Sequence, residues 1–439
     1  MKKITLMYCA LFTCFYLTAQ TKKDSTETYK KRVLEATEVS LLSSYYTQDG
    51  DNAAVTGGSG TEKLNDVTPT IVVAIPINDD DVVTINAEVS AYTSASSSNI
   101  NPFDGGKNAD AFVASSGASS SDTWAHFSGS YSHSSDDRNS IWSANLSASS
   151  EFDYTSFGFG GSYTKLFNEK NTELSINANI YLDKWNPVYP YELRPFADGG
   201  RGLNDPLFSQ YQITGNPNYQ PRFSEFADQK RNSYSAGLSF SQILSKRLQG
   251  VFLADFISQQ GLLSTPFQRV YFSDVDGSYI QNFQLADAIE QLPDSRFKVA
   301  LGGRLNYYIN EMFTLRTYYR YYFDNWGITS HTASIEVPIK IADKFTLYPS
   351  YRYYTQTAAD YFAPYEVHVS TEQFYTSDYD LSAFNANQYG FGISYTDIFT
   401  TFKLWQLGLK SIDLKYLYYQ RNTGFSANMF SLGLKFIMN

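Results

Sequence analysis

Apolar and polar residues alternate with a period of two along much of this chain. The segment 297–309 is the clearest case, since Phe297 and Leu301 fall on one face while Lys298 and Arg304 fall on the other. Successive side chains of a β-strand point to opposite sides, so this segment predicts a strand with one apolar and one polar surface. The same pattern predicts about sixteen strands, within a range of roughly fourteen to eighteen. They are 34–46, 68–77, 82–94, 123–134, 140–152, 155–167, 172–184, 232–245, 248–259, 296–309, 313–325, 331–341, 345–358, 388–397, 411–421 and 428–438.

The connections between these strands alternate between short polar turns, such as 78–81 and 168–171, and long loops. Transmembrane β-barrels have short periplasmic turns and long external loops. An even number of strands then places both chain ends on the periplasmic side. The chain is therefore predicted to be all-β, an antiparallel transmembrane up-and-down β-barrel. The long loops are 95–122, 185–231, 260–295 and 359–387.

Two local features refine the barrel prediction. Residues 319–322 and 351–354 both have the sequence Tyr-Arg-Tyr-Tyr, and residues 416–419 have the related sequence Tyr-Leu-Tyr-Tyr. Amphipathic rings prefer the membrane interface, so these motifs indicate an outer aromatic girdle. Residues 397–411 break the alternation, and they are predicted to be either a bulged strand or an interfacial segment.

The N-terminus predicts export to the outer membrane. Lys2 and Lys3 precede an apolar stretch that ends at Ala19, which is the arrangement of a secretory signal peptide. An uncleaved membrane anchor is one alternative, but the stretch is short for a span. Lipoprotein processing at Cys14 is another, although the residues before that cysteine are not small. The predicted segments are a signal peptide at 1–19, a short periplasmic segment at 20–33 and an outer-membrane β-barrel at 34–439.

Composition narrows the class of protein further. Both cysteines, Cys9 and Cys14, lie in the predicted signal peptide, so the mature chain has no thiol for disulfides or catalysis. The formal net charge is −10 and no basic cluster is present, so nucleic acid is not an expected partner. Aromatic residues are abundant, and no later apolar run has the length of a membrane helix. This combination fits a barrel, whose strands are only half apolar.

The search for chemistry gives little. No catalytic or phosphate-binding motif is present, so neither an enzyme nor a cofactor is predicted. His126 shares a polar face with Ser128, Ser130 and Ser132, which allows the hypothesis of a barrel hydrolase. The alternative is a histidine that is hydrogen-bonded in the lumen, and the geometric demands of a catalytic triad favour it.

A weak calcium candidate is formed by Asp274 and Asp276, which begin a segment that resembles a calcium loop. An EF-hand needs a glutamate at its twelfth position, where this chain has Leu285. The motif therefore fails as an EF-hand, and an ordinary Asp-Gly turn is the favoured interpretation.

The polar faces of the strands are sorted by charge along the chain. The first nine strands carry mainly acidic residues, and the later strands carry mainly basic ones, with Glu336 and Asp413 as exceptions. In a closed barrel this order predicts an acidic wall and a basic wall that face each other and impose a transverse field on the lumen. The acidic wall is Glu38, Glu88, Glu151, Glu173, Asp183 and Asp255. The basic wall is Lys298, Arg304, Arg316, Arg320, Lys340, Arg352, Lys415, Arg421 and Lys435.

Three functions are compatible with these observations. The first is a passive channel for small polar or ionic solutes, because about sixteen strands leave an aqueous interior. The second is a plugged, non-conducting barrel that acts with a periplasmic or surface protein partner in assembly or secretion. Interior charges that pair with each other look the same in sequence as selectivity residues. A barrel hydrolase is the third. Outer-membrane lipid surrounds the protein in each case.

The chain also resembles a known family. The lysine-started signal peptide, the early strand at 38–46, the acidic turn at 79–81, the long Ser-rich loop and the two Tyr-Arg-Tyr-Tyr strands are similar to a group of outer-membrane barrels that is catalogued only as a domain of unknown function. The resemblance covers nearly the whole mature chain. It implies a barrel, and it supplies neither a reaction nor functional residues.

Overall fold

The computed structural model describes residues 31–93, 121–197, 199–226 and 229–438. The chain divides into two compact units, Met1–Arg32 and Val33–Asn439, and the barrel belongs to the second. The predicted signal peptide at 1–19 and most of the predicted loop 95–122 lie outside the described residues.

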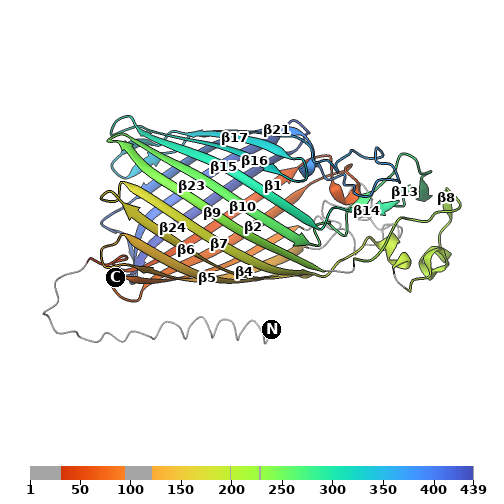
Figure 1. Ribbon diagram of the computed structural model, residues 1–439, viewed down its shortest axis with the longest axis horizontal. Helices are drawn as coiled ribbons and strands as arrows, with labels where there is room; N and C mark the ends of the chain where they lie inside the picture. The colour runs from red at the N-terminus through yellow and green to blue at the C-terminus, as the bar shows by residue number, and fades with distance from the viewer. Residues whose placement is uncertain (1–30, 94–120, 198, 227–228, 439) are drawn as a thin grey trace. The chain divides into compact units, whose positions relative to one another are not determined.

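The second unit is a closed antiparallel β-barrel of sixteen strands (Figure 1). Strands that follow one another along the chain pair with each other, and β1 (Thr37–Asp49) pairs with β24 (Ser426–Met438) to close the sheet. The predictions of an up-and-down barrel and of about sixteen strands are confirmed. The other strands and strand segments are β2 (Leu64–Pro76), β3 (Asp81–Thr93), β4 (Ser121–Ser134), β5 (Ser140–Ser150), β6 (Tyr154–Phe167), β7 (Thr172–Trp185), β9 (Lys230–Ser245), β10 (Leu248–Gly261), β15 (Ser295–Tyr308), β16 (Thr314–Asp324), β17 (Thr329–Glu336), β18 (Ile339–Ala342), β19 (Phe345–Leu347), β20 (Ser350–Gln356), β21 (Phe384–Thr396) and β23 (Leu407–Arg421). Two of the sixteen strands are each divided into two segments, β17 with β18 and β19 with β20.

Two strands that the sequence predicts as continuous, 331–341 and 345–358, are each divided. β17 and β18 form one traverse of the barrel, and β19 and β20 form the next. Pro338 and Pro349 lie at the two breaks, and a proline has no backbone N–H to donate to the ladder. Their carbonyls still accept, because Val337 N donates to Pro349 O at 3.0 Å and Thr314 N donates to Pro338 O at 3.1 Å. The paired breaks therefore leave the barrel closed.

The ends of the barrel differ. Thr37 at the start of β1 pairs with Met438 at the end of β24, so the first strand begins and the last strand ends at the same rim of the barrel. We call this rim the turn end and the opposite rim the loop end. Most connections at the turn end are short and polar. The segment after β21 is longer, contains β22 (Lys403–Leu404) and exposes large apolar side chains, with Phe399 84% and Trp405 95% exposed. The register of β23 also shifts between Leu409 and Ser411. The break in alternation at 397–411 thus combines a hairpin with a bulge.

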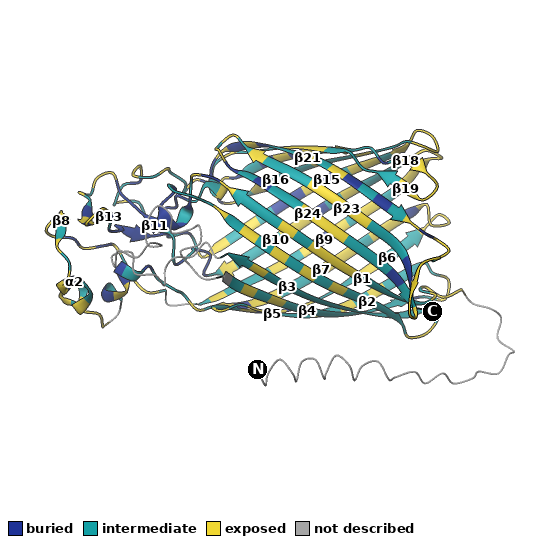
Figure 2. Ribbon diagram, turned by 180° about the vertical axis from the view of Figure 1, so that it is seen from behind, coloured by how far each residue is buried: buried dark blue, intermediate teal, exposed yellow. Residues whose placement is uncertain are grey.

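At the opposite end, the long loops fold into a cap made of the described residues of segments 50–63, 186–229, 262–294 and 357–383. Figure 2 shows that buried residues gather in this loop region, whereas the barrel surface is mostly intermediate or exposed. The prolines of 185–231 predict no regular strand, and between β7 and β9 the described residues of this segment form one strand of three residues, β8 (Ile213–Gly215). The cap elements are η2 (Ala54–Thr56), η3 (Tyr191–Phe196), η4 (Gly202–Asn204), α2 (Pro206–Ser209), β8 (Ile213–Gly215), β11 (Arg269–Val270), β12 (Ser278–Ile280), β13 (Phe283–Gln284), β14 (Ala288–Ile289) and η5 (Tyr379–Leu381).

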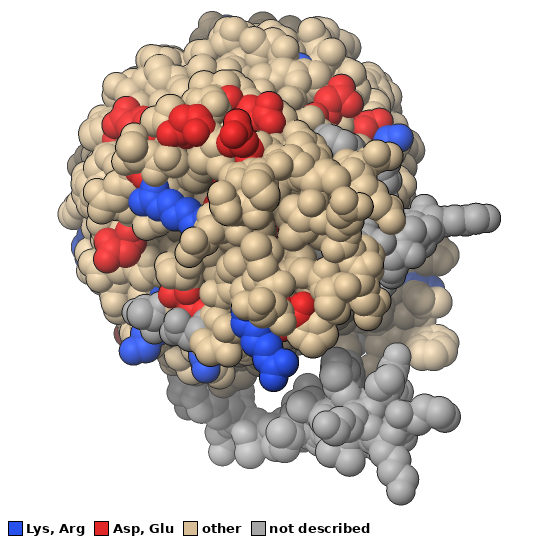
Figure 3. Space-filling view, turned by 90° about the vertical axis from the view of Figure 1, so that its right-hand side faces the viewer, with Lys and Arg blue, Asp and Glu red and all other residues tan. Residues whose placement is uncertain are grey.

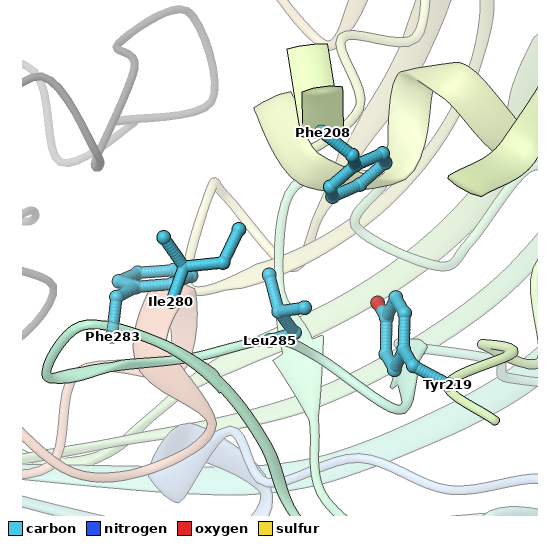
Figure 4. Close-up of a cluster of buried hydrophobic side chains, with 5 residues drawn as sticks. All are labelled: Phe208, Tyr219, Ile280, Phe283 and Leu285. Atoms are coloured by element: carbon cyan, nitrogen blue, oxygen red, sulfur yellow. The ribbon is translucent and has the colours of Figure 1, made fainter. Parts of the chain in front are cut away.

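The cap has hydrophobic clusters of its own. One of them brings Phe208 and Tyr219 from segment 186–229 against Ile280, Phe283 and Leu285 from segment 262–294 (Figure 4). Further clusters add residues of 357–383 to the same assembly. Burial of apolar area is the main stabilising contribution to such a structure. The long loops therefore form a folded layer at the loop end.

Candidate functional site

Register and exposure together define the inner face of the barrel. On β10, Phe252 and Phe256 are 47% and 44% exposed, so they face outward, and Asp255 between them belongs to the opposite face. Ladder partners point to the same side of a sheet, so the inner face can be followed from Asp255 to Gly237 on β9 and Ala300 on β15. The whole wall can be traced in this way.

The nine residues of the predicted basic wall lie on this inner face of β15, β16, β18, β20, β23 and β24. Several of them stack on aromatic rings. The guanidinium of Arg304 lies 5.4 Å from the ring centre of Tyr318, and that of Arg320 lies 6.0 Å from the ring centre of Tyr322. Arg304 is the register partner of Tyr318, and Ser334 of β17 is the partner of both Tyr318 and Arg352. Arg304 and Arg352 therefore lie in one row that runs across neighbouring strands.

The predicted acidic wall lies on β1, β3, β7 and β10 and directly after β5. Most of the contacts of these carboxylates are hydrogen bonds from uncharged side chains nearby. Glu88 accepts a hydrogen bond from Thr70 at 2.8 Å, Glu151 accepts one from Tyr92, and Asp183 accepts one from Tyr154. These hydroxyl groups hold the carboxylates in position, and they do not compensate the negative charge.

The acidic and basic sets meet where the barrel closes. Glu38 of β1 forms ion pairs with Lys435 of β24 at 2.7 Å and with Lys410 of β23 at 2.9 Å. Arg316 similarly pairs with Glu336 on the adjacent strand at 2.9 Å. The two walls are therefore partly neutralised by their own neighbours, and Lys410, which the sequence prediction omitted, belongs to the lumen. The bulge after Leu409 turns it inward.

Several charged side chains on the inner face are exposed. Arg304, Lys415, Asp413 and Asp255 are all exposed residues although they face the interior, and the Arg316 side chain is half exposed. Small side chains contribute, since Ser and Gly occupy many inner positions of β4, β5, β6 and β9. In an apolar, packed interior, charges of this kind would carry a large desolvation cost. In the described part of the barrel, these charged side chains of the inner face are therefore accessible to solvent.

A cavity of about 460 Å³ lies where the lumen meets the cap, and we call it the vestibule. Its wall side comes from β1, β20, β21, β23 and β24, and its roof comes from cap segments 50–63, 262–294 and 357–383. The charged residues that line it come from both parts. They are Glu62, Arg352, Asp378, Asp380 and Arg421.

The cap is held together by buried polar contacts. Arg269 and Glu192 form an ion pair at 2.7 Å in which both side chains are at most 2% exposed, and Arg269 also donates to Val55 O. Glu290 accepts hydrogen bonds from Thr265 N and from the Thr376 hydroxyl. Burial raises the pKa of Glu290 to about 8. These residues were not predicted from the sequence, which has no local motif that identifies them.

Other predicted candidates have ordinary contacts. The His126 ring stacks on Trp124 with ring centres 5.3 Å apart, and no serine hydroxyl bonds to it among the described residues. Asp274 accepts hydrogen bonds from Ser370 N and from the Ser370 hydroxyl, both at 2.8 Å, so it joins two cap segments. In the described ranges, Asp274 and Asp276 belong to no group of three or more metal-binding side chains.

The described residues include no helix that combines the length and apolar character of a membrane span. No curated protein matches the chain. Several solved structures are similar at low identity. A structure described as a bacterial polysaccharide outer membrane secretin has 11% identity and a TM-score of 0.46, with 92% of this chain and 99% of that chain covered. A FadL homologue from Pseudomonas aeruginosa has 11% identity and a TM-score of 0.40, with coverage of 92% and 91%.

A BenF-like porin from Pseudomonas fluorescens Pf-5 has 9% identity and a TM-score of 0.39, with coverage of 92% and 98%. The decisive comparison is with a protein family. A family model described as "Protein of unknown function (DUF3570)" matches residues 4–429, nearly the whole chain, so the resemblance inferred from the sequence is confirmed and this chain belongs to that family.

Proposed function

We propose that this protein is an outer-membrane channel that lets small polar and ionic solutes pass passively through its lumen. The observation that carries the proposal is the charged inner face of a closed sixteen-stranded barrel, on which several charged side chains are exposed. Barrels of about this strand number are wide enough to leave an aqueous interior. Charges that remain exposed inside the barrel, such as Arg304 and Asp255, are available to passing ions.

The outer face supports the membrane location. Large apolar side chains are exposed around the barrel, among them Leu146, Phe157, Phe252 and Phe430. A water-soluble protein rarely exposes an apolar surface that continues around its circumference. In a membrane the same side chains contact lipid, with the short turns in the periplasm and the cap outside. Export by a signal peptide at 1–19 is part of this proposal.

The cap determines how solutes enter. Its loops pack over the loop end, and in Figure 3 the described loop residues form a continuous surface over much of that end. We therefore expect a restricted entrance. A plugged barrel that serves a protein partner is the second candidate, and the separately packed cap favours it, since such a layer also offers a recognition surface.

Planar-bilayer conductance distinguishes the two candidates. Trp185 N donates to Gln229 O at 2.8 Å, so the ends of segment 186–228 are adjacent and a short Gly-Ser linker can replace it. Intact protein and this variant are compared after heat-modifiable migration has shown that both barrels are folded. Stable conductance of the intact protein supports the channel, with larger conductance expected for the variant. If neither protein conducts, the channel proposal is wrong.

A further inference from the structure

The vestibule combines charges that come from different parts of the fold. Arg352 and Arg421 belong to barrel strands, whereas Glu62, Asp378 and Asp380 belong to the cap. Aromatic and apolar side chains separate these charges, including Phe267, Phe425 and Met429. A cavity of about 460 Å³ that combines apolar side chains with convergent polar groups has the volume of small-molecule sites.

Arg421 is already satisfied by its neighbours. It donates to Asp380 at 2.6 Å and to the Tyr419 hydroxyl at 3.0 Å. Its guanidinium also lies 4.4 Å from the ring centre of Phe384 and 4.6 Å from that of Phe425. The Arg421–Asp380 pair is thus a fixed part of the wall, which leaves three charged groups of the vestibule to account for.

Arg352 is one of these groups. It faces the lumen, is exposed, and has no hydrogen bond or ion pair with any part of the chain that the structure describes. A guanidinium presents donors in a planar fork that matches a carboxylate. Arg352 is therefore available to bind the carboxylate of a solute.

Glu62 and Asp378 are the other two groups, and both have only neutral hydrogen-bond donors. Asn52 N donates to Glu62 at 3.1 Å, and Asp380 N donates to Asp378 at 2.9 Å. The Gln268 amide is also near Asp378, at 3.4 Å. Burial raises the pKa of both carboxyls, and the nearby Asp380 carboxylate raises it further, while Arg421 acts in the opposite direction. An ammonium group in the vestibule would compensate these negative charges.

Charges of both signs also lie along the route of a solute. Figure 3 shows a row of Asp and Glu side chains across the upper part of the loop end, with Lys and Arg side chains mostly in its lower part. Below the vestibule, the described lumen carries exposed basic side chains such as Arg304 and exposed acidic ones such as Asp255. A solute that carries both charges therefore meets groups of opposite sign at each stage.

We propose that the vestibule is a binding site for small zwitterionic solutes, with the carboxylate on Arg352 and the ammonium group at Glu62 and Asp378. This inference rests on the proposed channel function and names the class of solute. The apolar walls formed by Phe267, Phe425 and Met429 suit a solute with an apolar side chain.

Calorimetric titration of the full mature chain, refolded in detergent, tests the site with three probes that share one side chain. These are leucine, which is zwitterionic, leucinamide, which is cationic, and N-acetylleucine, which is anionic. Leucine is expected to bind at least tenfold more tightly than either derivative. Equal affinity for all three probes, or no binding of leucine, would overturn the inference.

Three variants sharpen the test. Arg352→Gln and Glu62→Gln should each weaken leucine binding about tenfold or more. Arg304→Gln is the matched control, because it removes the same charge from the same ladder row outside the cavity, and it should leave binding unchanged. A loss with Arg304→Gln equal to that with Arg352→Gln would show a general charge effect and overturn the site. Heat-modifiable migration verifies that each variant is folded.

The two proposals fail separately. If the protein conducts but does not bind leucine selectively, the channel proposal is supported and the proposal of a zwitterion site is wrong. If the barrel does not conduct but binds leucine selectively through Arg352, the proposal of the site is supported and the channel proposal is wrong.

Discussion

Glu38 on the first barrel strand and Lys435 on the last are joined by an ion pair of 2.7 Å, at the seam where the sheet closes. Lys410 approaches the same carboxylate to 2.9 Å. The contact therefore links three strands, β1, β23 and β24, near the turn end. It also joins a member of the acidic wall to a member of the basic wall, so the two charges compensate each other at the seam.

Replacing Glu38 with Gln should destabilise the barrel modestly, since two lysines lose their shared partner. We expect a loss of about 1 kcal/mol, because partly exposed ion pairs contribute at that level. Urea unfolding in detergent, followed by tryptophan fluorescence, measures the change. Lys63→Gln is the control, since its pair with Asp49 spans 3.8 Å and is exposed. Equal effects of the two substitutions would contradict a special role of the seam.

The charged walls predict a change in ion selectivity. Arg304→Gln and Arg320→Gln should each shift the reversal potential in a salt gradient toward cation selectivity, because each removes a positive charge from the lumen. Lys246→Gln, in a short turn at the turn end, serves as the control. The hypothesis of a selective basic wall is wrong if conductance and reversal potential stay the same in both lumen variants.

Glu290 predicts that alkaline pH loosens the cap. Burial raises its pKa from the ordinary value of 4.5 to about 8, so the cap favours the protonated form. The stabilising contribution is complete below pH 4.5 and is lost as pH rises through about 8. Burial also raises the pKa of Asp287, to about 6, which adds a loss in the same direction.

Single-channel conductance and protease sensitivity of segment 262–294 should therefore both increase between pH 6 and pH 9. Glu290→Gln keeps an acceptor for Thr265 N and should flatten the alkaline part of this response. Asp276→Asn, at an exposed position of the same segment, should leave it unchanged. A response that persists in Glu290→Gln would assign the pH dependence to another group.

The buried ion pair of the cap predicts a large effect of a small substitution. Glu192→Gln leaves the Arg269 charge buried without its partner, which costs about 3 kcal/mol for such pairs. Limited proteolysis should then cut segment 186–229 faster, while the barrel still shows heat-modifiable migration. Glu366→Gln, on the cap surface, is a comparison that should not accelerate cleavage. Unchanged proteolysis of Glu192→Gln would mean that the apolar clusters alone hold the cap.

The orientation of the barrel faces can be tested with lipids that carry bromine on their acyl chains. Trp142 is 45% exposed on the outer face of β5, whereas Trp124 faces the lumen and stacks on His126. The measurement is the fluorescence that brominated lipid quenches relative to ordinary lipid. Trp142→Phe should reduce this quenched amount, and Trp124→Phe should leave it unchanged. Quenching that depends on Trp124 would reverse the assignment of the faces.

Much of the barrel was predictable because its information is local. The alternation around Phe297 and Lys298 gives a strand and both of its faces, and the spacing of polar turns gives the parity of the connections. Even the failure of the pattern at 397–411 was informative, since a bulge there turns Lys410 toward Glu38. The divided strands were not predicted, although Pro338 and Pro349 are visible in the sequence.

The cap and the vestibule could not be predicted in the same way. Arg269 and Glu192 are 77 positions apart, and Glu62 reaches the cavity of Arg352 and Arg421 from the far end of the chain. No period connects such residues, because their contacts exist only in the closed barrel with its long loops packed on one another. The sequence by itself determined the strands, their faces and their order, since these follow from the geometry of an extended backbone. The tertiary structure alone decided which charges neutralise each other and which remain free to meet a solute, because pairing depends on distances across the closed barrel.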